Sequence, residues 1–209
     1  MAEFSPLARS SISPAEPLVA FEGWEVSGVR SEAPLRITDC TPLTKVGVRA
    51  DPEGDLADAL GVPFGHARRD QQGSLVIGSG PGEWLVLAAA GTAQSVVDGI
   101  QRLAVEEFAS VINLTHGRAL VRLTGGDAER LLAKLCAIDW SEAVTPDGSA
   151  LRTSVAAVVT DVIREDEREA GSYWLHCEWS SGQSLFDALI DAGAEFGIGV
   201  SGFLASASA

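Results

Sequence analysis

The side chains best suited to nucleophilic or metal chemistry are few: three histidines and three cysteines, namely His66, His116, His176, Cys40, Cys136 and Cys177. His176 and Cys177 are neighbours in an expected strand, so their side chains point to opposite faces and do not share a metal ion. No nucleophile motif surrounds His116, which favours a turn histidine bonded to backbone over a proton carrier. No Cys-x-x-Cys spacing occurs, which favours reduced core thiols. We therefore expect no catalytic, cofactor-binding or metal-ligating residue in this chain.

A glycine-rich run at residues 78–82, Gly-Ser-Gly-Pro-Gly, is the best candidate for a phosphate-binding loop. A dinucleotide site needs such a loop to open a helix, so that backbone N–H groups face the phosphates. Here the apolar run Glu-Trp-Leu-Val-Leu follows, which predicts a strand, and Pro81 lacks an N–H group. The pattern therefore predicts a hairpin turn and no nucleotide site.

Two acidic clusters offer carboxylates for acid–base chemistry: Asp51, Glu53, Asp55 and Asp58 in the first, and Asp161, Glu165, Asp166, Glu167 and Glu169 in the second. In both clusters the acids occupy loop and helix-start positions, which predicts solvated side chains. The run 164–169 is expected to be a charged loop tip between strands. Neither cluster is expected to be catalytic.

Five tryptophans accompany a single tyrosine. Trp84 and Trp174 lie in apolar runs at matching places in the two halves, which favours packing anchors within the sheets. Trp24, Trp140 and Trp179 lie at element edges. One or two of these three are candidates for contacts with a partner protein, because tryptophan is enriched at interfaces.

Composition excludes several classes of function. The 209 residues contain 15 Lys+Arg and 29 Asp+Glu, so the formal net charge is 15 − 29 = −14. This charge repels phosphate backbones and anionic lipids, so we expect neither nucleic-acid nor membrane binding. No apolar run is long enough to span a membrane, and no secretion signal is visible at the N-terminus. We expect a globular cytoplasmic protein.

Periodicity predicts a β-α-β-β-α-β order in the first half of the chain. The expected strands are 35–39, 45–50, two within 74–88, and 109–114, and the expected helices are 51–61 and 92–108. In the second half the expected strands are 118–125, one long or two short strands within 151–166, 172–179 and a possible last strand in 197–203, with helices at 127–138 and 181–197.

The second half also repeats short pieces of the first. Glu83-Trp84-Leu85 matches Tyr173-Trp174-Leu175, and Gln94-Ser95 matches Gln183-Ser184. Shared spacing of this kind indicates an internal repeat. We predict an α+β fold with two ferredoxin-like βαββαβ repeats, at about 35–114 and 115–203. Each is expected to form an antiparallel sheet with helices on one face, and a pseudo-two-fold axis relates them.

The two ends of the chain are expected to lie outside this domain. Residues 1–34 form an N-terminal arm in this interpretation. Pro6, Pro14 and Pro17 interrupt residues 1–20, which favours a tail over an arm ordered against a partner. If the segment is a strap, deleting residues 1–20 is expected to weaken assembly and leave the domain folded. Residues 204–209 are expected to be a disordered tail.

Four blocks carry a resemblance to a known family: GPGEWLVL (80–87), INLTHGRALVRLTGGDAERLLAKLCAID (112–139), RTSVAAVV (152–159) and SGQSLFDALIDAGAEFG (181–197). With these blocks in this order, the chain resembles the gamma subunit of heterotetrameric sarcosine oxidase from about residue 35 to 203. That family is in turn similar to the folate-binding domain of glycine-cleavage aminomethyltransferase.

The resemblance implies a non-catalytic subunit that supports the flavin-bearing subunits, with alpha, beta and delta chains as partners. The complex of that family oxidatively demethylates sarcosine and transfers the one-carbon unit to tetrahydrofolate. FAD, FMN, NAD, zinc and tetrahydrofolate are then expected in the partner subunits, and none in this chain. Two alternatives stay open: a stand-alone folate-binding protein or one-carbon transferase, and a homo-oligomeric scaffold.

Overall fold

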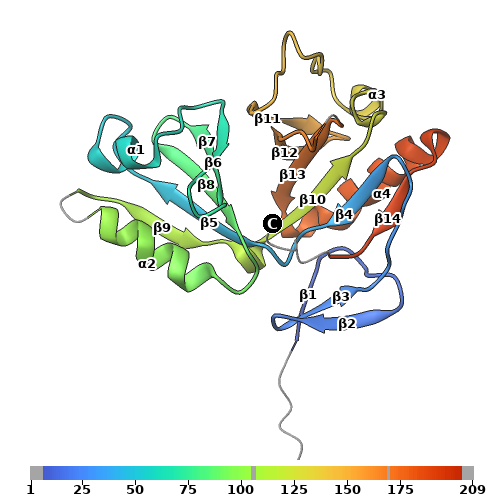
Figure 1. Ribbon diagram of the computed structural model, residues 1–209, viewed down its shortest axis with the longest axis horizontal. Helices are drawn as coiled ribbons and strands as arrows, with labels where there is room; N and C mark the ends of the chain where they lie inside the picture. Colours follow the sequence, from blue (N-terminus) through green and yellow to red (C-terminus); the bar gives the residue numbers. More distant parts are fainter. Residues whose placement is uncertain (1–6, 105–106, 169, 204–209) are drawn as a thin grey trace, which may run out of the picture.

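The computed structural model of the protein describes residues 7–104, 107–168 and 170–203. Within these ranges the chain forms three β-sheets and four α-helices (Figure 1). This is the α+β class expected from the sequence. The two larger sheets face each other across the middle of the molecule, and the small N-terminal sheet lies beneath them in the view of Figure 1.

The six-stranded sheet belongs mainly to the C-terminal half, and its strands lie in the order β11-β12-β13-β10-β4-β14. The strand bounds are β4 Arg36–Asp39, β10 Arg118–Thr124, β11 Ala150–Val155, β12 Val158–Arg164, β13 Ser172–Glu178 and β14 Gly199–Ser201. Neighbouring strands are antiparallel except for β14, which pairs in parallel with β4. The pair β11 and β12 corresponds to the predicted alternative of two short strands, and β14 to the possible last strand.

The five-stranded sheet is antiparallel throughout, in the order β6-β7-β8-β5-β9. Its strands are β5 Thr44–Arg49, β6 Ala67–Arg69, β7 Leu75–Gly80, β8 Glu83–Ala88 and β9 Ser110–Asn113. Pro81 and Gly82 join β7 to β8, and Gly82 has a φ of 68°, a left-handed conformation that glycine adopts without strain after proline in a tight turn. The glycine-rich run is therefore a hairpin turn, as predicted.

The helices cover the outer faces of the two large sheets, which gives a helix–sheet–sheet–helix order (Figure 1). Helices α1 (Asp55–Leu60) and α2 (Ala93–Leu103) pack on the five-stranded sheet, and α3 (Ala128–Leu135) and α4 (Gly182–Gly193) pack on the six-stranded sheet. Leu131, Leu132, Leu185 and Leu189 are buried because helical spacing places them on the sheet-facing side.

Between the sheets lies a third core, which we call the inter-sheet core. It contains Leu75, Ile77, Leu85, Leu87, Leu120, Ala150, Ile163, Trp174 and Cys40. Arg69 of the five-stranded sheet bonds across to Glu165, next to β12, with an Nε–Oε1 distance of 2.6 Å. Both faces of each large sheet are thus buried over part of their area, so alternating side chains from one strand enter two different cores.

Two expectations about the repeats need correction. The sheets are not both antiparallel, because β14 joins β4 in parallel. The expected first repeat, about 35–114, also does not coincide with one sheet: β4 lies in the six-stranded sheet, where it pairs with β10. The matched tryptophans differ as well. Both are buried, as predicted, but Trp84 packs toward the helices and Trp174 toward the other sheet. The two ferredoxin-like repeats therefore stay a prediction.

The expected N-terminal tail is wrong for the described part of residues 1–20. Strands β1 (Ala8–Arg9), β2 (Leu18–Phe21) and β3 (Trp24–Ser27) form a small sheet, in which β3 pairs with both others. Ile12 is buried in the core beneath α3 and α4. Hydrophobic burial therefore holds this segment on the domain despite its prolines, and a deletion of residues 1–20 would remove part of the fold. Residues 1–6 and 204–209 lie outside the described residues.

Candidate functional site

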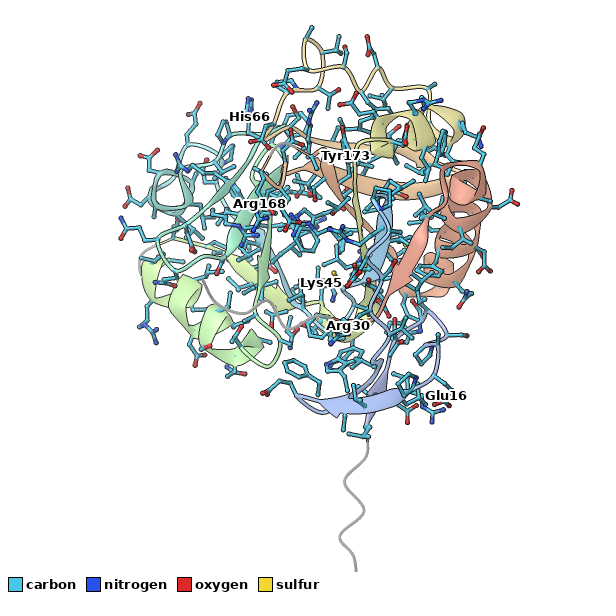
Figure 2. All side chains as sticks on the ribbon, turned by 45° about the vertical axis from the view of Figure 1, so that its right-hand side comes forward. Glu16, Arg30, Lys45, His66, Arg168 and Tyr173 are labelled. Atoms are coloured by element: carbon cyan, nitrogen blue, oxygen red, sulfur yellow. The ribbon has the colours of Figure 1, made fainter. Side chains whose placement is uncertain are left out.

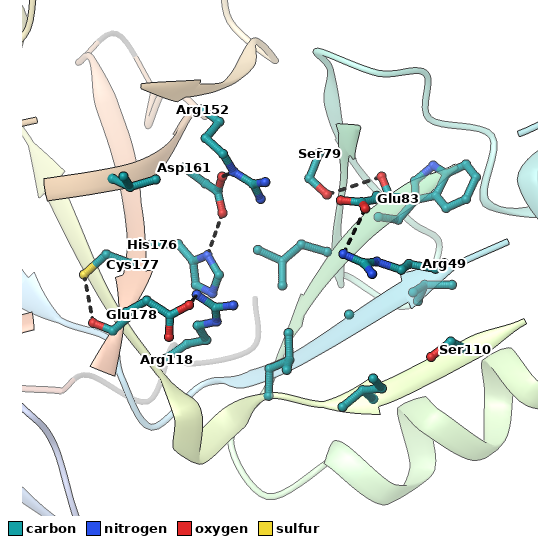
Figure 3. A pocket seen from close by; sticks show the side chains of 17 residues that line it. Arg49, Ser79, Glu83, Ser110, Arg118, Arg152, Asp161, His176, Cys177 and Glu178 are labelled. Atoms are coloured by element: carbon teal, nitrogen blue, oxygen red, sulfur yellow. Dashed lines mark hydrogen bonds and ion pairs between the residues drawn. The ribbon is translucent and has the colours of Figure 1, made fainter. Parts of the chain in front are cut away.

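A cleft of about 450 Å³ opens between the two large sheets, beside the inter-sheet core (Figure 3). One wall comes from β5, β7, β8 and β9, and the other comes from β10, β11, β12 and β13. The charged, imidazole and exposed apolar side chains that line it belong to Arg49, Glu83, Ile112, Arg118, Arg152, Val159, Asp161, His176 and Glu178. We call this space the cleft.

Small and charged residues line the cleft, and they do not fill the gap between the sheets with an apolar core. Gly47, Ser79 and Ser110 line the wall of the five-stranded sheet, where they offer little side-chain volume. On the other wall Asp161 and His176 are register partners in the antiparallel pair of β12 and β13. Charged groups resist dehydration, so these positions do not close into a dry core as Leu120 and Ile163 do.

Each wall of the cleft carries ion pairs. On the five-stranded sheet, Arg49 bonds to Glu83 with an Nη2–Oε1 distance of 3.0 Å. On the six-stranded sheet, Arg152 bonds to Asp161 with an Nε–Oδ1 distance of 2.6 Å, and Arg118 pairs with Glu178. These three arginines and three carboxylates compensate one another. The cleft is therefore polar but close to neutral.

The most buried polar pair in the cleft joins Asp161 and His176. The imidazole Nδ1 lies 2.9 Å from Asp161 Oδ2, and the His176 side chain is only 5 % exposed. Burial lowers the pKa of His176 more than the neighbouring carboxylate raises it, so the ring is neutral near pH 7. Burial opposes ionisation of Asp161, but hydrogen bonds from His176 and Arg152 lower its pKa. In this pair the ionised carboxylate of Asp161 accepts a hydrogen bond from the protonated Nδ1 of the neutral His176 ring.

This arrangement leaves the other ring nitrogen as an acceptor. With the proton on Nδ1, the Nε2 atom carries a lone pair. Nε2 is buried and has no hydrogen-bond partner among the described residues. Figure 3 shows the His176 ring between Asp161 and Arg118, on the cleft side of β13. An oriented imidazole with a free nitrogen can accept a hydrogen bond from a ligand or take up a proton.

A second buried ionisable group, Lys45, lies on β5 two residues before the cleft wall begins at Gly47. Its side chain is fully buried in the middle of the molecule (Figure 2). Nζ donates to the carbonyl oxygens of Thr41 at 2.6 Å and Leu43 at 2.8 Å. Burial lowers the pKa of Lys45 to about 7, although the charge of Asp39 opposes this. These two hydrogen bonds fix the segment between β4 and β5, which connects the two large sheets.

The residues that line the cleft do not include His66, His116, Cys40 or Cys136, whereas Cys177 is among them. His66 is exposed and its Nδ1 lies 3.2 Å from the carbonyl oxygen of Phe64. His116 stacks on Trp24 with ring centroids 4.8 Å apart, a contact that the sequence did not indicate. Cys40 and Cys136 are buried free thiols, and burial raises the pKa of Cys40 to about 12. Cys177 is buried toward the helices, on the opposite face of β13 from His176, as predicted.

The prediction of solvated carboxylates holds for one cluster and fails for part of the other. Asp51, Glu53, Asp55, Asp58 and Glu167 are exposed, and Glu169 lies outside the described residues. Asp161, Glu165 and Asp166 are instead partly buried in ion pairs. Arg164, expected at a loop tip, ends β12 and is buried, where it bonds to Asp166, Glu142 and Glu129. Strand pairing moves these residues inside, which their local sequence did not indicate.

The edge tryptophans also differ from expectation. Trp24 and Trp140 are buried, so neither is available to a partner. Trp140 packs edge-on against Tyr173, with centroids 5.6 Å apart. Trp179 is partly buried against the N-terminal sheet.

In the part of the chain that the structure describes, no group of three or more His, Cys, Asp or Glu side chains is placed to hold a metal ion. No helix in the described ranges is long and apolar enough to cross a membrane.

Solved structures share this architecture. A chain of the heterotetrameric sarcosine oxidase from Corynebacterium sp. U-96 is 26 % identical with a TM-score of 0.69, and the match covers 81 % of this chain and 88 % of that chain. The glycine cleavage system aminomethyltransferase T from Bartonella henselae is 15 % identical with a TM-score of 0.69. That match covers 88 % of this chain and 55 % of the aminomethyltransferase, and it shows the fold alone.

Comparison with curated proteins finds no match. The family described as the GCVT N-terminal domain matches residues 73–209, which include β7 to β14 and most of the cleft. This match spans more than half of the chain. The chain therefore belongs to the GCVT N-terminal domain family.

Proposed function

We propose that the chain is the non-catalytic gamma-type subunit of a heterotetrameric sarcosine oxidase in the cytoplasm. The observation that carries this proposal is the reciprocal coverage of the match to a chain of such an oxidase, 81 % of this chain and 88 % of that one. A shared fold over nearly the whole of both chains favours a shared place in an assembly. A match to one domain of a larger enzyme would support a shared place in an assembly less strongly.

In this proposal the chain stabilises the flavin-bearing subunits, and the alpha, beta and delta chains are its partners. FAD, FMN, NAD, zinc and tetrahydrofolate then belong to those partners. The three arginines of the cleft each pair with a carboxylate of their own wall, and such paired charges suit a structural role. Exposed apolar side chains such as Phe64 and Val144 supply surface that a partner would cover.

Co-purification tests this proposal. The chain is tagged in its native cell, isolated gently, and analysed by visible absorption and by the masses of co-eluting chains. We expect flavin bands and three further chains near equimolar ratio, with peroxide formed when sarcosine is added. A cell that expresses a tagged, unrelated acidic protein is the control. A colourless eluate that contains this chain alone would contradict the proposal, and its mass by light scattering would identify a homo-oligomeric scaffold.

A stand-alone folate-binding protein or one-carbon transferase is the second candidate, and the size of the cleft favours it. A volume near 450 Å³ lies within the range of small-molecule sites, roughly 300–1,000 Å³. The donor set fits folate less well. A pteridine ring donates hydrogen bonds to carboxylates, and Glu83, Asp161 and Glu178 are each held by an arginine. We derive no catalytic step through folate. Tetrahydrofolate titration of the isolated chain separates this candidate from the scaffold.

A further inference from the structure

The unpartnered nitrogen of His176 is the starting point for a binding site that the subunit role does not require. His176 is 4 % exposed, and Nδ1 is committed to Asp161. Nε2 therefore faces the cleft side as a buried acceptor with no donor among the described residues. Buried polar atoms in folded proteins nearly always have a partner, so an acceptor left free beside a cleft indicates a ligand that donates to it.

Arg118 provides the second contact. It lies one step diagonally from His176 on the neighbouring strand, since Leu120 is the register partner of His176 and Glu178 that of Arg118. Figure 3 shows the Arg118 guanidinium beside the imidazole ring. Its present partner, Glu178, has a side chain that is 62 % exposed. Exposed ion pairs contribute little to stability, so a ligand carboxylate can replace Glu178 at small cost. The movement of Arg118 would also uncover Nε2.

The walls of the cleft define the rest of the ligand. Two sheets that pack face to face stand about 10 Å apart, which leaves room for one layer of side chains or one flat ring between them. Leu85, Ile112 and Val159 offer apolar surface on the two walls. Ile112 and Val159 are 54 % and 68 % exposed, which is unusual for large apolar side chains within a cleft. A flat apolar ring would cover both.

We propose that the cleft binds a small heteroaromatic carboxylate, whose ring N–H donates to His176 Nε2 while its carboxylate accepts from Arg118. The N–H and the carboxylate must be adjacent on the ring, because Arg118 and His176 are side by side on one wall. Asp161 holds the imidazole in the tautomer that leaves Nε2 free, so it acts as a positioning residue. This inference goes beyond the subunit role and does not depend on it, since the site belongs to this chain alone.

Two matched probes test the donor. Indole-2-carboxylate carries an N–H beside its carboxylate, and benzofuran-2-carboxylate has the same shape with an oxygen in place of the N–H. Calorimetric titration of the full chain is expected to give about tenfold tighter binding of the indole, the difference of one hydrogen bond to a buried acceptor. Equal affinities for the two probes, or no binding of either at millimolar concentration, would overturn the proposal.

Two arginine variants test the carboxylate contact. Arg118→Gln is expected to weaken indole-2-carboxylate binding about tenfold or more, because the charge-assisted bonds are lost. Arg9→Gln is the matched control, since Arg9 also pairs with a carboxylate, Glu25, but belongs to the N-terminal sheet and does not line the cleft. It is expected to leave the affinity unchanged. Equal losses in both variants would show attraction by charge alone and contradict the assigned contact.

A direct observation of His176 avoids the risk that a buried histidine variant fails to fold. In the wild-type chain, the ¹⁵N resonance of Nε2 is expected to shift when indole-2-carboxylate is added and to stay in place with benzofuran-2-carboxylate. An unchanged Nε2 resonance at saturation with the indole would place the ligand elsewhere. The co-purification experiment does not involve these readouts, so either proposal can fail without the other.

Discussion

The inter-sheet core and the cleft lie between the same two sheets, yet one is closed and the other is open. Strands β12 and β13 contribute to both: Ile163 and Trp174 enter the core, and Asp161 and His176 line the cleft. Strand pairing is continuous across the two regions. Backbone geometry therefore does not separate them. The side chains at facing positions decide whether the sheets close into a core or leave a site.

The closed region also has polar bonds between its layers. Glu165 bonds to Arg69 of the other sheet and accepts from Trp174 Nε1 at 2.8 Å. Within the six-stranded sheet, Arg122 lies over the ring of its register partner Trp174, at 4.6 Å from the ring centroid. At the cleft, each ion pair instead joins residues of one sheet. Bonds across the gap fasten the sheets, whereas bonds within a wall leave the gap free for a ligand.

The largest expected effect comes from truncating the core on β12. Ile163→Ala is expected to lower the free energy of unfolding by about 2–5 kcal/mol, since it leaves a cavity at a fully buried position. Val159→Ala, on the same face of the same strand but in the cleft, is expected to change it by less than about 0.5 kcal/mol. Urea unfolding measures both. Similar losses in both variants would mean that the cleft is packed in solution, and they would contradict the distinction between a closed core and an open cleft.

The buried Lys45, next to the cleft, is expected to make the free energy of unfolding depend on pH. Above about pH 7 the folded lysine loses its proton, while the unfolded lysine keeps it up to its ordinary pKa of 10.5. The unfolded state then binds more protons, so stability rises with pH, by at most ~1.4 kcal/mol per pH unit. The useful window ends at about pH 8.5, because thiols of the unfolded chain begin to ionise near their ordinary pKa of 9.0.

The check is the slope of unfolding free energy against pH in the wild type and in Lys45→Met. The variant is expected to be nearly flat between about pH 7 and 8.5, whatever its absolute stability. A wild-type slope near zero would mean that Lys45 stays protonated in the folded state. Lys134→Met is a suitable control, because Lys134 lies on the outer face of the molecule in α3, where it pairs with Glu195.

A smaller effect separates bonds between the layers from bonds within one wall. Glu165→Gln keeps the shape but weakens the bonds to Arg69 and Trp174, and is expected to cost about 1–2 kcal/mol of unfolding free energy. Glu178→Gln weakens only an exposed pair within one sheet, and is expected to cost about 0–1 kcal/mol. The two variants are compared by thermal unfolding. A greater loss in Glu178→Gln would reverse the assignment of the fastened and open regions.

The smallest expected effect concerns the hairpin that carries Arg152 and Asp161. Its turn residues Ala156 and Ala157 have positive φ values of 48° and 64°, which strain a residue with a Cβ. Ala157→Gly is expected to raise stability by about 0.5–1 kcal/mol. Ala67→Gly in β6, at an ordinary backbone conformation, is expected to lower it by a similar amount. Denaturant midpoints measure both, and destabilisation by Ala157→Gly would show an unstrained turn.

Local pattern was sufficient for most elements. The strand at 172–179, the helical spacing of Leu131 and Leu132, and the Pro81-Gly82 turn each depend on neighbours in sequence, so they could be predicted. The weak points were the N-terminal strands, which three prolines obscured, and the partner of β4, which lies some 80 residues away in β10. Only packing onto the finished domain holds these strands in place.

The cleft was missed for a related reason. Alternation along β12 and β13 shows that each strand has two faces, but in a sheet that is covered on both sides it does not show which face meets the helices and which meets the second sheet. Asp161 and His176 are 15 residues apart and become partners only through antiparallel register. The sequence by its local periods determined most of the strands and helices and the hairpin turn at Pro81-Gly82. The tertiary structure decided that a carboxylate, an imidazole and an arginine share one wall, because their proximity depends on strand pairing and on how the two sheets pack.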